Sequence, residues 1–301
     1  MRYYSLNDYC KKTFGEKVYK LSLNAGMTCP NRDGSLSYTG CFYCSEGGSG
    51  DFASDSSLTI AAQLSEARRR LSSKTDCRKF IAYFQAFTNT YAPVEYLEKI
   101  FYEAISDPSV CVLSIGTRTD CFNDEIYDLL SRLNNIKPVW IELGLQSIHQ
   151  STLDAMNTHT KVSDFTVVCN ELNKRNIKVI AHLILGLPGE TKEMMLESVD
   201  FAAKSNIFGI KLQLLHVLRN TKLAELYEKD PFPLFSLEEY CDFIVDCIER
   251  LPPGMVIHRM TGDGPRKLLI APMWSTDKKR VLNTINQNFI KRNTYQGRFF
   301  M

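Results

Sequence analysis

Long apolar runs are absent from this chain of 301 residues. No stretch approaches the roughly 18 apolar residues that a membrane-spanning helix needs, which excludes an integral membrane protein of the helical kind. Residues 1–8 contain no apolar segment of the signal-peptide type, so we expect no export signal. The chain also lacks a large excess of positive or negative residues, because its formal net charge is only +2. The chain as a whole is therefore neither strongly basic nor strongly acidic.

Two further patterns are missing. The ten cysteines are spread through a chain too long to be a small disulfide-framed secreted domain, so we expect a reducing, cytoplasmic protein. No G-x-G-x-x-G follows the first predicted strand, which argues against a dinucleotide-binding fold. Hydrophobic residues make up 44% of the chain and charged residues 23%, as in ordinary globular proteins.

Short apolar segments alternate with segments of helical periodicity along most of the chain. Strands are predicted over residues 18–23, 79–86, 110–116, 139–145, 178–185 and 209–217, with a possible seventh over 256–260. Helices are predicted over 58–71, 94–105, 125–133, 149–156, 162–175, 191–204, 222–229 and 236–249. This alternation is typical of parallel βαβ units, which can form an open doubly wound sheet or a barrel. We favour an α/β fold with a partial six-stranded (β/α) barrel over residues 18–260, preceded by an N-terminal extension, residues 1–17.

Three cysteines lie within sixteen residues just after the first predicted strand: Cys29, Cys41 and Cys44. Structural zinc takes four protein ligands. A [4Fe–4S] cluster held by only three thiolates keeps one iron open to a small molecule. The spacing allows such an open cluster, a zinc site completed by Cys10 or Cys77, or three unrelated core cysteines.

Polar residues stand at the end of every predicted strand. In (β/α) barrels the working groups gather at these carboxyl ends. The candidates are Gln85, Arg118, Glu142, Gln146, His182, Glu190, Gln213 and His216. A single one, such as His182, is more often a satisfied core histidine, but a polar residue at all six strand ends predicts a binding site.

The C-terminal segment, which we delimit as residues 261–301, is basic. Between residues 265 and 301, eight Lys or Arg residues face one acid, Asp277, which gives a local net charge of +7. Aromatic residues are interleaved with them, as in surfaces that contact phosphates and bases. A solvated helix face with its aromatics docked on the barrel fits the same pattern.

Cys41-Phe-Tyr-Cys44 after an upstream cysteine resembles the cluster loop of radical S-adenosylmethionine (radical SAM) enzymes. The first spacing is eleven residues where three are usual, a feature of the elongator-like and MnmL (YtqA)-like branches. Further blocks at residues 142–147 (ELGLQS), 182–190 (HLILGLPGE), 258–264 (HRMTGDG) and 271–275 (APMWS) are similar to the MnmL (YtqA)-type family. The likeness covers about residues 1–290.

The resemblance implies a radical SAM partial barrel with two cofactors, a [4Fe–4S] cluster on Cys29, Cys41 and Cys44 and SAM on its open iron. It implies a cofactor pocket formed by Tyr43, Gln85, Arg118, Glu142, Gln146 and Glu190, and catalytic roles for Gln85, Arg118, Glu142 and His182. One block departs from the family: Asn157-Thr158-His159-Thr160 stands where the family has Asn-Arg-Gly-His. Another residue, such as Arg118, would then bind the SAM carboxylate.

The resemblance also implies a substrate, the wobble uridine of tRNA, on which a carboxymethylaminomethyl group at C5 becomes aminomethyl. The implied partners are the tRNA anticodon stem-loop, an electron donor such as flavodoxin or ferredoxin, and a downstream tRNA methyltransferase. We further expect Asn31, Arg32 and Asp33, in the long gap between cysteines, to face the RNA. Two alternatives remain at this point: radical SAM chemistry on a small molecule such as a porphyrin or lipid precursor, and a non-catalytic, zinc-stabilised RNA-binding protein.

Overall fold

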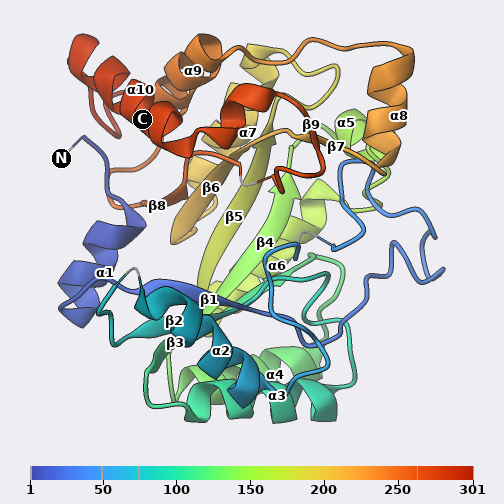
Figure 1. Cartoon of the computed structure of the whole chain (residues 1–301), viewed down its shortest axis with the longest axis vertical. Helices are drawn as coiled ribbons and strands as arrows, with labels where there is room; N and C mark the ends of the chain where they lie inside the picture. Colours follow the sequence, from blue (N-terminus) through green and yellow to red (C-terminus); the bar gives the residue numbers. More distant parts are fainter. Residues whose placement is uncertain (1, 49, 74, 263, 301) are drawn as a thin grey trace.

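A seven-stranded parallel sheet forms the centre of the computed structural model, which describes residues 2–48, 50–73, 75–262 and 264–300. Its strands lie in the order β1-β2-β3-β4-β5-β6-β8, and the sheet curls into an open barrel (Figure 1). The strands are β1 (Tyr19–Leu23), β2 (Phe80–Phe84), β3 (Val110–Thr117), β4 (Val139–Gln146), β5 (Lys178–Leu185), β6 (Gly209–Leu214) and β8 (Val256–Arg259). The predicted partial barrel is confirmed, with seven strands instead of six.

Six of the connecting helices cover the outside of the sheet: α2 (Ile60–Ser72), α3 (Val94–Ser106), α4 (Asp124–Asn134), α6 (Val162–Lys174), α7 (Lys192–Lys204) and α9 (Leu237–Glu249). Two shorter helices are α5 (Gln150–Ala155), which follows β4, and α8 (Lys222–Lys229), which packs on β7 (Val217–Leu218). Several of these helices begin at capping residues that can be recognised in the sequence. The side chains of Asn123 and Thr191 accept hydrogen bonds from backbone amides in the first turns of α4 and α7. Ser236 and Glu239 form a capping box at the start of α9.

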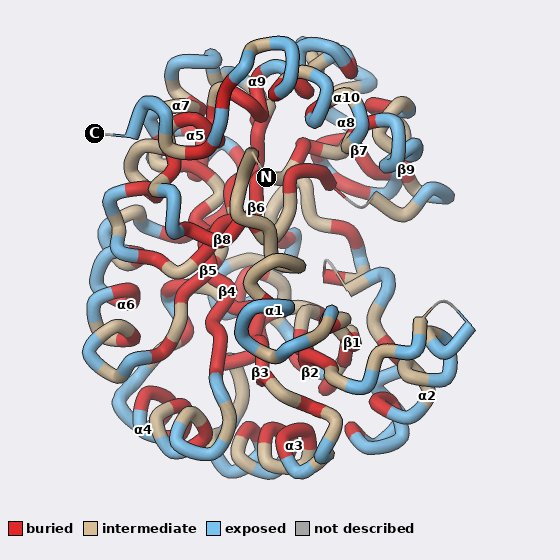
Figure 2. The backbone as a smooth tube through the Cα atoms, turned by 90° about the vertical axis from the view of Figure 1, so that its left-hand side faces the viewer, coloured by how far each residue is buried: buried red, intermediate tan, exposed pale blue. Residues whose placement is uncertain are grey.

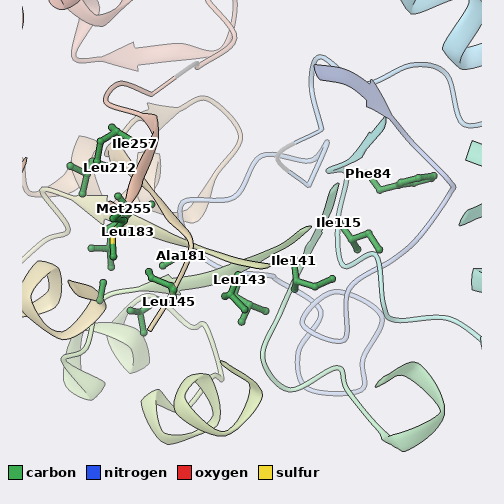
Figure 3. Packing of buried hydrophobic residues seen from close by; sticks show 14 of the residues in the cluster. Phe84, Ile115, Ile141, Leu143, Leu145, Ala181, Leu183, Leu212, Met255 and Ile257 are labelled. Atoms are coloured by element: carbon green, nitrogen blue, oxygen red, sulfur yellow. The ribbon is translucent and has the colours of Figure 1, made fainter. Parts of the chain in front are cut away.

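Alternation along β4 separates the core from the barrel interior. Ile141, Leu143 and Leu145 point outward into the hydrophobic core beneath the helices (Figure 3). Their neighbours Trp140 and Glu142 point into the barrel, because successive side chains of a strand face opposite sides of the sheet. The same alternation on the other strands gives the barrel its own inward-facing set of residues.

Helix α1 (Leu6–Phe14) closes the amino-terminal end of the barrel. Cys10 lies in a buried cluster with Val18, Ile81, Val112, Trp140 and Ile180, and Tyr9 packs edge-on against Trp140. Figure 2 shows the buried strands surrounded by helices whose outer sides are exposed. This apolar layer confines the polar interior of the barrel to the carboxyl ends of the strands.

The C-terminal part differs from the prediction because one predicted strand is split and a second, two-stranded sheet is present. The predicted strand over residues 209–217 is broken after β6, and β7 (Val217–Leu218) pairs antiparallel with β9 (Leu269–Ala271). A 3-10 helix (Met273–Thr276) then leads into α10 (Lys278–Lys291), which packs on α9. None of the helices in the described part of the chain is long and apolar enough to cross a membrane.

Part of the basic C-terminal segment is neutralised within the fold. Arg292 forms ion pairs with Asp242, Asp246 and Glu249 of α9, and Phe289 is fully buried. The docked-helix interpretation therefore holds for these two residues, which cannot contact RNA while they are packed. Arg266 and Lys267, in contrast, are exposed.

Candidate active site

A cavity of about 280 Å³ lies at the carboxyl ends of the barrel strands. The loop after β1 supplies Cys29, Cys41 and Cys44 to its wall. The strands and the segments that follow them supply, among others, Tyr83, Gln85, Arg118, Glu142, Gln146, His182, Lys211, Gln213, His216 and Arg259. The structure thus brings the three cysteines and most predicted strand-end residues to one site.

Two residues of the long gap fix the shape of the cysteine loop. The side-chain amide of Asn31, which is fully buried, donates to the carbonyl of Asn157 (2.6 Å) and to Cys41 Sγ (3.4 Å). Arg32 Nη2 donates to the carbonyl oxygens of Cys44 (2.9 Å) and Ser45 (2.7 Å). Our expectation that Asn31 and Arg32 face RNA is therefore wrong, because the Asn31 side chain is buried and its NH2 group and Arg32 Nη2 are bonded to the loop and to Asn157.

The segment that departs from the family supports the same loop. Asn157, in the left-handed region with φ 54°, donates from its side chain to the carbonyl of Gly40 (2.9 Å). Thr158 and Thr160 reach the cavity wall, whereas His159 hydrogen-bonds to Asn157 and stays outside. The segment therefore contributes two hydroxyl groups to the site and no cation.

The cysteine thiols lie in a poorly solvated environment beside a cation. Burial and the neighbouring Cys44 raise the pKa of Cys41 to about 11, while Arg118 and the amide of Asn31 act in the opposite direction. Arg118 is itself held by Asp120 in a two-point ion pair of 2.8 and 2.7 Å. Tyr43, inside the Cys-x-x-Cys segment, also lines the cavity.

Gln146 offers the cavity a hydrogen-bond acceptor that has no partner. It ends β4 in the left-handed region (φ 64°), and Gly144 gives it room, since a Cβ on Gly144 would lie 2.6 Å from Gln146 Nε2. Its Oε1 is buried, and no donor among the described residues reaches it. Asn31 Oδ1, in the cysteine loop, is another buried polar atom without a partner among the described residues.

A buried network of charged residues forms the floor of the cavity. Glu142 is 0% exposed and forms ion pairs with Lys20 of β1 and Lys211 of β6. It also accepts hydrogen bonds from Ser114 Oγ (2.7 Å) and from Nε2 of His182 (2.8 Å). Four strands therefore converge on one carboxylate.

The network fixes the charge states of its members. Burial acts to raise the pKa of Glu142, but Lys20, Lys211 and His182 outweigh it and hold that pKa well below its usual value. Burial and the ammonium of Lys211 lower the pKa of His182 to about 4. At neutral pH Glu142 is thus ionised and His182 is neutral, which makes His182 the hydrogen-bond donor of the pair.

Comparison with known proteins identifies the family. Residues 28–202 match the Radical SAM superfamily, and residues 207–291 match the Radical SAM C-terminal domain. The chain is 42% identical over 299 residues to the uncharacterized protein YtqA of Bacillus subtilis (strain 168), covering 99% of this chain and 93% of that one. The chain belongs to the radical SAM superfamily.

The chain is also similar, over part of its length or in its fold, to two archaeal proteins. It is 26% identical over 169 residues to a Methanocaldococcus jannaschii protein named tRNA uridine(34) acetyltransferase, covering 53% of this chain and 30% of that one. Its fold is similar to that of the archaeal Methanocaldococcus infernus Elp3, with a TM-score of 0.70, 16% identity, and coverage of 93% of this chain and 64% of that one.

The cofactors of this radical SAM enzyme are a [4Fe–4S] cluster and SAM, not the zinc ion that the cysteine spacing also allowed. The cavity fits this pair, because three cysteines of one loop line it together with polar side chains from the strand ends, among them Gln85, Arg118 and Gln146. No three His, Cys, Asp or Glu side chains in the described ranges are placed to share one metal ion. A cubane cluster does not need such a set, because each thiolate binds its own iron.

Because it holds the cysteine loop, Arg32 should affect how firmly the radical SAM cluster is retained. Residues that orient metal ligands typically contribute tenfold to a hundredfold to metal affinity, so Arg32→Ala should release iron to a chelator at least about tenfold faster than wild type. Asp33→Ala is the matched control, since the Asp33 side chain is exposed in the same loop and accepts a hydrogen bond from the Ser35 amide, whereas its own contact with Cys29 is through the backbone. Equal release rates for the two variants would contradict the role of Arg32.

Sequence reasoning missed part of the radical SAM site and misplaced one residue. Glu190 does not line the cavity; it accepts a hydrogen bond from Ser147 behind the end of β4. Lys211, Tyr83 and Arg259 line the cavity but were not predicted. Lys211 could have been found, because a lysine two residues before Gln213 in an apolar strand faces the same side of the sheet.

Proposed function

We propose that this radical SAM enzyme acts on the wobble uridine of tRNA and converts a carboxymethylaminomethyl group at C5 into aminomethyl. The observation that supports tRNA as the substrate is the 26% identity, over 169 residues, to the protein named tRNA uridine(34) acetyltransferase. The Elp3-like fold is consistent with it. The particular change at C5 rests on the resemblance of the sequence blocks to the MnmL (YtqA)-type family.

In this proposal Cys29, Cys41 and Cys44 hold the cluster, and Gln146, Gln85 and Tyr43 line the SAM side of the cavity. When bound, the cluster and SAM would supply an organic radical that takes a hydrogen atom from the carboxymethyl carbon and a cluster that takes a second electron back. Hydrolysis of the resulting imine would leave the aminomethyl group and release the two carbons as glyoxylate. The protein supplies orientation and keeps water away during the hydrogen transfer. Asn31 and Arg32 keep the cysteine loop in shape. The apolar layer beneath Glu142 closes the barrel to solvent from the amino-terminal end.

The segments that contribute lining residues to the cavity also carry exposed side chains that suit an RNA loop. Phe52 lines the cavity and is 58% exposed, and Tyr38, in the long gap between Cys29 and Cys41, is 82% exposed. Exposed aromatic side chains can stack on unpaired bases. Arg266 and Lys267 follow the lining residue Pro265 and are exposed, so they can contact phosphates. We expect binding of an anticodon stem-loop to weaken steeply with salt.

Mass spectrometry of tRNA nucleosides from a deletion strain tests the proposal. Carboxymethylaminomethyluridine should accumulate, and the aminomethyl and methylaminomethyl nucleosides should disappear. The wild-type gene should restore them, and a gene encoding Cys41→Ser should not. If no wobble uridine changes, the tRNA assignment fails, and a radical SAM enzyme that acts on a small molecule becomes the better description.

A further inference from the structure

Two lysines share one buried carboxylate at the floor of the cavity. Glu142 pairs with both Lys20 and Lys211, and it also accepts a hydrogen bond from neutral His182. One lysine is enough to neutralise the charge of Glu142. A second ammonium group in a poorly solvated place is costly unless it is paired with another anion, so the second lysine requires an explanation.

The two lysines differ in what they face. Lys211 lines the cavity, and its side chain is 4% exposed. The Lys20 side chain is 19% exposed and reaches the same carboxylate from the edge strand β1, but it does not line the cavity. Both ammonium groups lie above the ring of Tyr83, 4.4 Å (Lys20) and 4.7 Å (Lys211) from its centre, and Lys211 also donates to the Tyr83 hydroxyl (3.2 Å). Lys211 is therefore the member of the pair that a ligand can reach.

A second cation accompanies Lys211 on the cavity wall. Arg259, at the end of β8, also lines the cavity, and β8 is paired with β6 so that Lys211 and Arg259 are direct neighbours across the two strands. An ammonium beside a guanidinium is a common arrangement for binding carboxylates. Burial lowers the pKa of Lys211 and Glu142 acts against it, so an anion in the cavity would further favour the charged form.

We propose that Lys211 and Arg259 form an anion site at the cavity floor that binds a carboxylate of the substrate. This inference rests on the proposed function, since a carboxymethylaminomethyl group carries a carboxylate and the aminomethyl product does not. The site would select the substrate by its charge and release the product once that charge is gone. The carboxylate of SAM is the other possible source of the anion, and the experiment separates the two.

Binding of two synthetic anticodon stem-loops to the reconstituted holoenzyme tests the site. One carries carboxymethylaminomethyluridine and the other its uncharged carboxamide. Wild type should bind the carboxylate form about tenfold more tightly, equivalent to about 1.4 kcal/mol. Lys211→Met should abolish this preference, and Arg259→Gln, which leaves the Glu142 ion pairs in place, should reduce it.

Lys20→Met is the matched control, because it removes an ammonium from the same carboxylate outside the cavity wall. It should keep the tenfold preference, and the Kd for SAM should stay unchanged in all variants. Equal loss of preference in Lys20→Met and Lys211→Met would mean that the lysines only balance Glu142. A lower affinity for SAM in Lys211→Met, with the stem-loop preference intact, would assign the site to SAM and overturn the proposal.

A second measurement does not depend on RNA. Anomalous diffraction from holoenzyme crystals soaked in sodium bromide should show an anion beside Lys211 in wild type and Lys20→Met, and none in Lys211→Met. If bromide binds but neither stem-loop does, the tRNA function fails and the anion site stands. If both stem-loops bind equally well and no bromide appears, the anion site fails and the tRNA function stands.

Discussion

Cys41→Ser should leave the reconstituted protein with almost no bound iron and no SAM cleavage. The cysteine loop supplies only three thiolates, so the loss of one leaves two, and a serine hydroxyl is a poor substitute for a soft thiolate ligand. The loop itself should keep its shape, because Asn31 and Arg32 hold it mainly through backbone carbonyls. Iron and sulfide analysis after anaerobic reconstitution, with assay of 5′-deoxyadenosine, measures the effect.

Cys77→Ser is the matched control for this prediction. Cys77 donates to the carbonyl oxygens of Lys17 (2.6 Å) and Lys79 (3.1 Å), bonds that a serine hydroxyl can also make. It was also a possible fourth ligand in the zinc interpretation of the sequence. Full iron content in Cys77→Ser and none in Cys41→Ser is the expected pattern; iron lost from both, or kept in both, would contradict the three-cysteine site.

Glu142→Gln should lower the free energy of unfolding by about 3–5 kcal/mol, the usual cost of leaving buried charges without their partner. Lys20, Lys211 and His182 all depend on this carboxylate. Ser114→Ala is the control, because it removes a single hydrogen bond to the same carboxylate and should cost less, about 1.5–3 kcal/mol. Urea unfolding of the two variants and wild type at pH 7 measures the difference, and equal losses would contradict the network.

The same network sets the direction of the pH dependence. The folded protein holds the pKa of His182 near 4, below its usual 6.5, so wild type should lose stability as the pH falls from 6.5 toward 4. The pKa of Glu142 is also depressed, so its contribution is present above its usual 4.5 and is lost as the pH falls below that value. Burial also holds the pKa of His258 well below 6.5, so His182→Gln should reduce the first part of this loss and not abolish it, and Glu142→Gln should reduce the second. A wild-type stability that rises as the pH falls from 6.5 to 4.5 would contradict the His182 assignment.

The sequence was sufficient for the elements of the barrel because its signals are local. The strand over residues 139–145 differs from β4 by one residue, and Asn123, Thr191 and Ser236 mark the starts of α4, α7 and α9. The second small sheet was missed because β7 and β9 are two and three residues long and pair across some fifty residues. Nothing in so short a segment distinguishes it from a loop.

The site was predictable where a polar residue interrupts an apolar strand, as Glu142 and His182 do. Glu190 was misplaced because the chain turns at Gly186 and Gly189, which have φ 92° and 84°, and the Glu190 carboxylate then bonds to Ser147. Asn31 and Arg32 were misassigned for a related reason. Their partners, Asn157 and the carbonyls of Cys44 and Ser45, are set by the folded loop and not by its composition.

The most direct test of the whole account is a reaction with purified components under anaerobic conditions. The reconstituted protein, SAM, a chemical reductant and tRNA bearing carboxymethylaminomethyluridine are combined, and the nucleosides and 5′-deoxyadenosine are measured together. We predict that carboxymethylaminomethyluridine decreases, aminomethyluridine appears, and both changes require Cys41. Formation of 5′-deoxyadenosine without any change in the tRNA nucleosides would contradict the tRNA function and leave only the radical SAM chemistry.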